Sequence, residues 1–91
     1  MRQPFHAESR SVSEFVILDL QGEINAFANQ ELQAVYEQAE GSSSSTILLN
    51  FQAVDYINST GIAMIVSLLA RARQTHRRMV AFGLSEHYQD I

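Results

Sequence analysis

A chain of 91 residues can form one domain with a modest core, and 46% hydrophobic with 18% charged residues is the composition of a folded protein. The formal net charge of -4 argues against direct nucleic-acid binding, and a sequence without cysteine has no disulfides and no thiolate chemistry. No apolar run approaches the roughly 20 residues that span a bilayer, and residues 1–10 are too polar for a secretory signal. We therefore expect a cytoplasmic protein without membrane insertion.

Three short apolar runs predict buried strands at residues 15–20, 47–51 and 79–82. Gly22 closes the first run. Because the runs do not alternate between apolar and polar residues, they favour strands covered on both faces, as in a parallel or mixed sheet flanked by helices. Residues 5–10 are a candidate for an additional edge strand.

Two helices are predicted between these strands. The first should begin near Asn25, a favoured N-cap residue, and end near Gly41. Its buried stripe has the spacing of one helical face and consists of Leu32, Val35, Tyr36 and Ala39. The serines at 42–45 that follow are interpreted as a flexible connector.

The second predicted helix covers residues 59–74. Its apolar stripe consists of Ile62, Ile65, Val66, Leu69 and Ala72. Met64 then lies on the opposite, polar side with Thr60, Ser67 and Arg71, either as an isolated exposed side chain or as a contact for a partner. With a further helix starting at Ser85, the order of elements predicts an α/β layered domain.

Basic residues gather at the end of the second predicted helix. The cluster consists of Arg71, Arg73, His76, Arg77 and Arg78. Such residues stabilise the negative end of a helix dipole, which is the first interpretation. An acidic partner is the alternative.

Residues 54–62 pass from an apolar strand through small polar residues into an apolar helix, which is typical of a helix N-terminus. Asn58, Ser59 and Thr60 are residue types that cap the unpaired amides of a first turn. A phosphate on Ser59 would meet the same amides and the positive end of the helix dipole. Its charge of about -1.5 to -2 would alter any surface docked there without unfolding the domain.

The sequence resembles the STAS domain of anti-sigma factor antagonists over nearly its whole length. The resemblance rests on Leu20-Gln21-Gly22-Glu23-Ile24-Asn25, on residues 47–51, and on Asp55-Tyr56-Ile57-Asn58-Ser59-Thr60-Gly61. It implies a STAS-like mixed β-sheet with helices packed against it. We expect a single STAS domain at residues 1–91, truncated or incomplete at its C-terminus, because the family's last strand and helix would follow Ile91.

The resemblance also implies a function. Ser59 falls on the residue that an anti-sigma factor serine kinase phosphorylates in this family. A serine phosphatase then removes the phosphate, so the chain is expected to be a partner-switching antagonist of that kinase. The expected partner-binding surface consists of Gly22, Glu23, Ile24, Asn25, Asn58, Ser59, Thr60, Gly61 and Met64. Two residues depart from the family pattern, because Asn58 and Asn25 stand where Asp is usual and so lower the local negative charge.

Other functions stay open. The Asn58 departure leaves open a second function, a non-catalytic STAS subunit of a transporter or a stress-signalling scaffold, in which Ser59 is only a cap. Nucleotide binding is a third hypothesis, although no phosphate-cradling glycine loop is present. We expect no enzyme, catalytic residue, cofactor or metal, because Ser59 lacks an evident base and His6, His76 and His87 are far apart without metal-ligand spacing. A homo-oligomer is compatible with the sequence.

Overall fold

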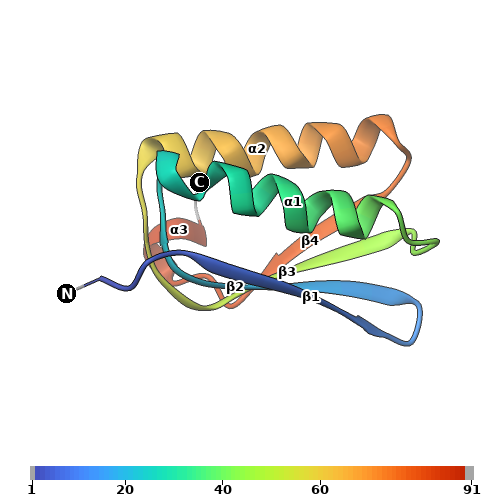
Figure 1. The fold of residues 1–91 in the computed structure, drawn as a ribbon, viewed down its shortest axis with the longest axis horizontal. Helices are drawn as coiled ribbons and strands as arrows, with labels where there is room; N and C mark the ends of the chain where they lie inside the picture. The colour runs from blue at the N-terminus through green and yellow to red at the C-terminus, as the bar shows by residue number, and fades with distance from the viewer. Residues whose placement is uncertain (1, 90–91) are drawn as a thin grey trace.

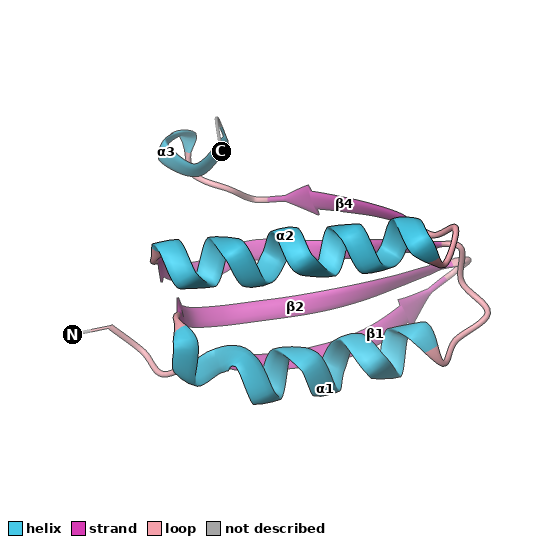
Figure 2. Ribbon diagram, turned by 90° about the horizontal axis from the view of Figure 1, so that it is seen from above, coloured by secondary structure: helices cyan, strands magenta, loops and turns pink. Residues whose placement is uncertain are grey.

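The computed structural model describes residues 2–89, except for the side chains of His87 and Gln89. Helices α1 (Asn29–Glu40) and α2 (Ser59–Gln74) lie on the same face of a single sheet, as Figure 1 shows. Seen from above, the two helices run side by side along the strands (Figure 2). The expected α/β class is confirmed. Within the described range, no helix is both long and apolar enough to cross a membrane.

The sheet contains β1 (His6–Val12), β2 (Phe15–Ile24), β3 (Thr46–Ile57) and β4 (Arg78–Phe82), in that spatial order. β1 pairs antiparallel with β2, and both remaining pairs are parallel, so the sheet is mixed. β1 confirms the predicted edge strand. Two residues connect β1 to β2, and the first of them, Ser13, has a φ of 56°.

The prediction that both faces of the sheet are covered is wrong. Both helices lie on one face, and β3 alternates, with Ile47, Leu49 and Phe51 buried and Leu48 half-buried. Phe15, Val80 and Phe82 are exposed by more than a third of their surface. A short continuous apolar run can occur in a strand covered by helices on both faces and in a strand with one face in water, so the sequence pattern does not distinguish these two arrangements.

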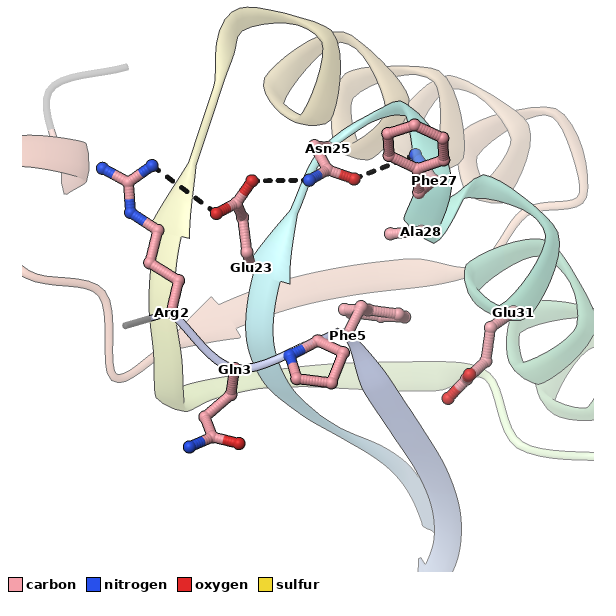
Figure 3. A pocket seen from close by; sticks show the side chains of 9 residues that line it. Arg2, Gln3, Phe5, Glu23, Asn25, Phe27, Ala28 and Glu31 are labelled. Atoms are coloured by element: carbon pink, nitrogen blue, oxygen red, sulfur yellow. Dashed lines mark hydrogen bonds and ion pairs between the residues drawn. The ribbon is translucent and has the colours of Figure 1, made fainter.

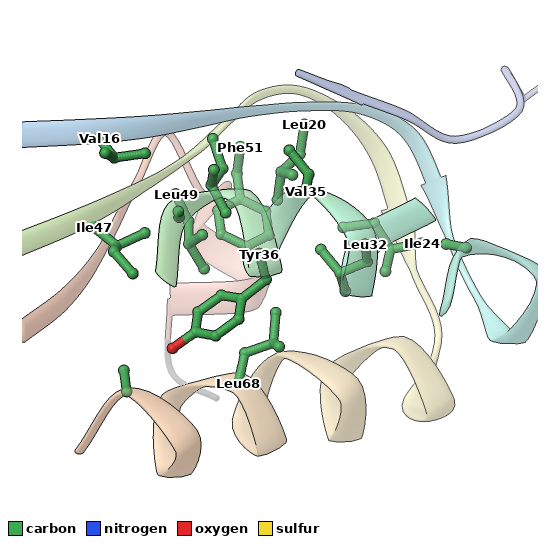
Figure 4. Packing of buried hydrophobic residues seen from close by; sticks show 14 of the residues in the cluster. Val16, Leu20, Ile24, Leu32, Val35, Tyr36, Ile47, Leu49, Phe51 and Leu68 are labelled. Carbon is green, nitrogen blue, oxygen red and sulfur yellow. The ribbon is translucent and has the colours of Figure 1, made fainter. Parts of the chain in front are cut away.

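The core lies between the helices and the sheet (Figure 4). In α1 the buried side chains are the four that the sequence predicts: Leu32, Val35, Tyr36 and Ala39. They meet Val16, Leu18 and Leu20 of β2 and the inward-facing residues of β3 in one cluster. Burial of this apolar surface supplies most of the stability of a domain of this size.

The predicted bounds of α2 are confirmed, but its predicted stripe is confirmed only in part, because Ala72 is buried and Ile62 and Ile65 pack against the core whereas Val66 does not. The buried residues of α2 are Gly61, Leu68 and Ala72, and Met64 is half-buried against the core instead of lying on a polar face. Val66 is 55% exposed. The helix is rotated because its first turn packs against the end of β2 through Gly61, so Ile62 and Leu69 line a groove of about 250 Å³ between α2 and β4.

The basic cluster stabilises the contact between helices, although by contacts other than those predicted. Arg71 of α2 donates to both carboxylate oxygens of Glu40, at 2.6 and 3.0 Å, and lies 5.1 Å from the Tyr36 ring centroid. Arg77 donates to the carbonyl oxygens of Glu40 at 2.6 Å and of Ser42 and Ser44 at 3.3 Å. Arg77 therefore caps the carboxyl end of α1 and also binds two carbonyls of the serine connector.

Candidate functional site

The register of β2 and β3 brings two segments of the chain together. Ile24, the last residue of β2, pairs with Ile57, the last residue of β3, so residues 22–25 lie beside residues 58–61. The amide of Asn58 donates to the carbonyl of Ile24 at 3.2 Å. The carboxyl ends of neighbouring parallel strands commonly form ligand and partner sites in α/β sheets.

Gly61 permits this close approach. A Cβ at Gly61 would overlap the backbone carbonyl of Ile24, so no larger residue fits without moving α2 from β2. Gly22 has a similar role at the other side, where its φ is 85° and a Cβ would overlap the carbonyl oxygen of Pro4. Both predicted site glycines are therefore buried backbone positions that shape the surface and do not present a side chain to a partner.

Asn58 is the residue that caps α2. Its Oδ1 accepts from the amide of Gly61 at 2.8 Å, and the capping role expected of Asn58 is confirmed. The same role for Ser59 and Thr60 is wrong, because Asn58 occupies the N-cap and both of these residues lie within the helix. Their side chains are exposed, and the Ser59 hydroxyl makes no hydrogen bond to the described residues. Ser59 is thus accessible for modification.

Glu23 and Asn25 form a polar network next to this helix end (Figure 3). The Asn25 amide donates to Glu23 at 2.5 Å, and the Arg2 guanidinium lies 3.5 Å from the same carboxylate. The Asn25 Oδ1 accepts from the amide of Phe27 at 2.9 Å and so caps η1 (Ala26–Ala28), the short 3-10 helix that precedes α1. Asn25 therefore marks a helix start as predicted, although the first turn is 3-10.

The N-terminal segment supports the site from one side. The amide of Gln3 donates to Asp55 at 3.0 Å, and the amide of Glu23 donates to the carbonyl of Gln3 at 2.9 Å. The Arg2 guanidinium lies 3.7 Å from the centroid of the Tyr56 ring, in cation–π geometry. These contacts join the ends of β2 and β3 through the start of the chain.

The C-terminal helix supports the other side. Helix α3 (Glu86–Gln89) follows Ser85, where a helix start was predicted. The hydroxyl of Tyr88 accepts from the amide of Ile57 at 3.1 Å, directly before the cap residue Asn58. Three hydrogen bonds, from Ile57, Asn58 and Gly61, therefore fix the turn that presents Ser59.

Sequence analysis missed one prominent residue near the site. Phe27 is 96% exposed, far more than any other large apolar side chain described. It lies one position before Ala28, which is buried and belongs to the inner stripe of η1 and α1. The signal was present, because position 27 falls outside the spacing of that stripe. The nearby hollow of about 410 Å³ includes Phe27 in its rim (Figure 3).

The histidines do not converge on Ser59. His6 lies 3.2 Å from Glu31 and 3.4 Å from Glu8 at the outer strand β1, and His76 is exposed after α2. The side chain of His87 lies outside the described residues. Among the described residues, no group of three His, Asp or Glu side chains is arranged to hold a metal ion.

Comparison with known proteins identifies the family. The STAS domain model matches residues 6–91, so the chain belongs to the STAS domain family. The anti-sigma-B factor antagonist of Staphylococcus aureus (strain NCTC 8325 / PS 47) is 24% identical over 79 residues, which are 87% of this chain and 73% of that protein. STAS domains of the anti-sigma factor antagonist family are non-catalytic regulatory modules, and the chain is not an enzyme.

Solved structures share the fold. The anti-sigma factor antagonist SpoIIAA in its unphosphorylated form superposes with a TM-score of 0.73 at 20% identity, covering 96% of this chain and 79% of SpoIIAA. The phosphorylated form of SpoIIAA from Bacillus gives 0.72 at 20% identity, covering 96% and 78%. Mglu gives 0.77 at 20% identity over 87% of this chain, which corresponds to only 20% of Mglu. The same architecture therefore occurs both as a small regulator and as part of a larger chain.

Proposed function

We propose that this chain is a cytoplasmic antagonist of an anti-sigma factor serine kinase and that phosphorylation of Ser59 switches the binding off. The observation that carries the proposal is the exposed Ser59 on a helix end fixed by Asn58 and Ile24. A kinase needs an accessible hydroxyl, and a switch needs a fold that tolerates the phosphate. The exposure of Ser59 supports the first condition, and the first turn of α2, which contains no acidic residue, supports the second.

Electrostatics explains why a phosphate would change binding and not folding. The first turn of α2 contains no acidic residue, so a phosphate on Ser59 would meet the positive end of the helix dipole without a carboxylate in that turn. In a protein interface the same phosphate would have to lose its water or meet a cation. Binding to a surface that fits neutral Ser59 would therefore weaken sharply.

The described roles of the relatives support this proposal. The Staphylococcus protein is described as an anti-sigma-B factor antagonist, and SpoIIAA is known in phosphorylated and unphosphorylated forms. A serine phosphatase would complete the cycle by restoring free Ser59. The partner surface that we propose includes Glu23, Asn25, Ser59 and Thr60, shaped by the buried backbone of Gly22, Ile24 and Gly61, with Met64 contributing only its exposed part.

The test uses purified anti-sigma factor kinases of the source organism. Wild type and Ser59→Ala should bind one of them, and only wild type should be phosphorylated with ATP, at Ser59 by mass spectrometry. Ser59→Asp should weaken binding at least tenfold by calorimetry, whereas Thr60→Asp, which adds the same charge one residue later, should weaken it less. Equal affinity of wild type and Ser59→Asp would contradict the switch.

A second function is favoured by Asn58. Asp is usual at this position in the family, and here an amide whose oxygen caps Gly61 replaces it. In a non-catalytic subunit of a transporter or scaffold, Ser59 would never meet a kinase, and Ser59→Asp would leave the assembly intact. Size-exclusion chromatography of the assembly with each variant separates this function from the kinase switch.

A further inference from the structure

We propose that Phe27 is the anchor by which this chain binds its kinase, inserting into an apolar pocket beside the kinase's active site. This inference rests on the proposed function, because it names the residue that provides most of the binding energy at the same surface. Phe27 was not among the residues expected to bind a partner.

The exposure of Phe27 is the first observation. The ring is 96% exposed, whereas Val66, Val12 and Phe15 are exposed by 55%, 45% and 39%. Single exposed apolar residues are common on proteins, but an almost fully exposed phenylalanine gives up the whole benefit of burial in the free protein. Covering it on binding would recover that benefit.

The backbone of Phe27 is already fixed in the free protein. Its amide donates to Asn25 Oδ1 at 2.9 Å, and the amide of Ala28 donates to the Asn25 carbonyl at 3.0 Å. Asn25 is in turn bound to Glu23, and the flanking residues Ile24 and Ala28 are buried in the core. Because the backbone at Phe27 is already ordered, binding has to fix only the side-chain torsions of the ring, which keeps the entropy cost of this contact low.

The position of η1 determines which partner covers Phe27. The 3-10 helix packs against α2, and α2 begins at Ser59 beside Ile24. A standard interface covers about 800 Å² of each partner, which corresponds to a patch of about 16 Å radius. Phe27 follows Ile24 by three residues, and the carbonyl of Ile24 accepts from the amide of Asn58, so a kinase centred on Ser59 for phosphate transfer would also reach Phe27. The occupant is the enzyme that modifies Ser59, and its surface needs an apolar pocket next to the nucleotide.

The experiment measures the affinity of the same purified kinases for four proteins. Phe27→Ala should weaken binding at least about thirtyfold, as expected for a dominant interface residue. Val66→Ala, which removes an exposed apolar side chain on α2 instead of η1, should change affinity less than threefold. Ser59→Asp reports on the switch independently. Circular dichroism should show unchanged stability for Phe27→Ala, since its ring has almost no contacts to lose.

The outcomes separate the two proposals. A strong loss of kinase affinity with Phe27→Ala, together with an unchanged affinity of Val66→Ala, supports the anchor. If Phe27→Ala binds within threefold of wild type while Ser59→Asp does not bind, the anchor is overturned and the switch stands. If wild type binds none of the kinases, the proposed function fails and the anchor fails with it.

Discussion

The carbonyl oxygen of Ile24 occupies the space that a side chain on Gly61 would need. This contact sets the distance between the end of β2 and the first turn of α2. It also places Ser59 next to residues 22–25, because the amide of Asn58 is bound to the same carbonyl. The site therefore depends on the absence of a single Cβ.

Gly61→Ala should accordingly destabilise the protein by about 1–3 kcal/mol, because the added methyl group forces α2 away from β2. Urea denaturation followed by circular dichroism measures the change. Gly41→Ala is the matched control, since Gly41 has a helical φ of -72° and the new Cβ would lie 3.6 Å from the carbonyl oxygen of Gln38, which is ordinary contact. That variant should be neutral or more stable by about 0.4–1 kcal/mol. Equal effects of the two substitutions would contradict the packing argument.

Tyr36→Phe should leave the protein equally stable or raise its stability by about 1 kcal/mol. The ring is buried in the core, and its hydroxyl has no hydrogen-bond partner among the described residues. Burial also raises the pKa of Tyr36. Removing an unpaired buried hydroxyl avoids its desolvation cost and keeps the packing of the ring. Tyr36→Ala, which removes the ring as well, should cost about 3–5 kcal/mol in the same denaturation experiment.

Arg77→Met should loosen the end of α1 and the serine connector. The substitution removes the donor for three backbone carbonyls. A hydrogen bond from a charged donor contributes about 1.5–3 kcal/mol to stability. Amide hydrogen exchange should accelerate at residues 40–46. Arg73→Met removes an exposed arginine at the end of α2 and should leave exchange there unchanged. Unaltered exchange in Arg77→Met would show that the connector is held by other contacts.

The pair formed by Asp19 and Arg10 should make stability depend on pH in acid. Hydrogen bonding from Arg10, at 2.6 Å, and then from Asn50, at 2.8 Å, holds the pKa of Asp19 below its usual value, although burial opposes the shift. In the unfolded chain, Asp19 is protonated at a higher pH, because its pKa there is about 3.9. This contribution is therefore present above about pH 4 and is lost as pH falls through the lower pKa of the folded protein.

Asp19→Asn tests this dependence. Because the Asp19 side chain is 34% exposed, the variant should be less stable than wild type by only roughly 0.5 kcal/mol at neutral pH. The difference should shrink below about pH 4, as measured by urea denaturation across pH. Glu14→Gln, at an exposed turn residue, should show no such trend. A difference that grew in acid would reverse the expected sign.

The sequence predicted the parts of the fold that depend on local pattern. The bounds of α2 and the inner face of α1 followed from periodicity, and the Asn58 cap followed from residue type. The rotation of α2 was not predictable in this way, because it is set by Gly61 packing against Ile24, a contact between residues far apart in sequence. Met64 was misplaced for the same reason.

The candidate site was likewise predicted only in part. The segments around Glu23 and Ser59 were identified by resemblance, and the register of β2 with β3 brings them together. Arg2, Gln3 and Tyr88 were not identified, since nothing local indicates that the two ends of the chain contact this turn. Phe27 could have been found as the apolar residue that the helical spacing excludes.

The mixed sheet also has a kinetic consequence. Only β1 and β2 are joined by a short turn, so this hairpin can form from local contacts, whereas both parallel pairs must wait for a helical crossover to close. Residues 22–25 meet residues 58–61 after the first of these closures. We therefore expect the surface around Ser59 to appear only after segments far apart in sequence have paired, so that an enzyme that recognises its shape distinguishes a folded domain from an unfolded chain.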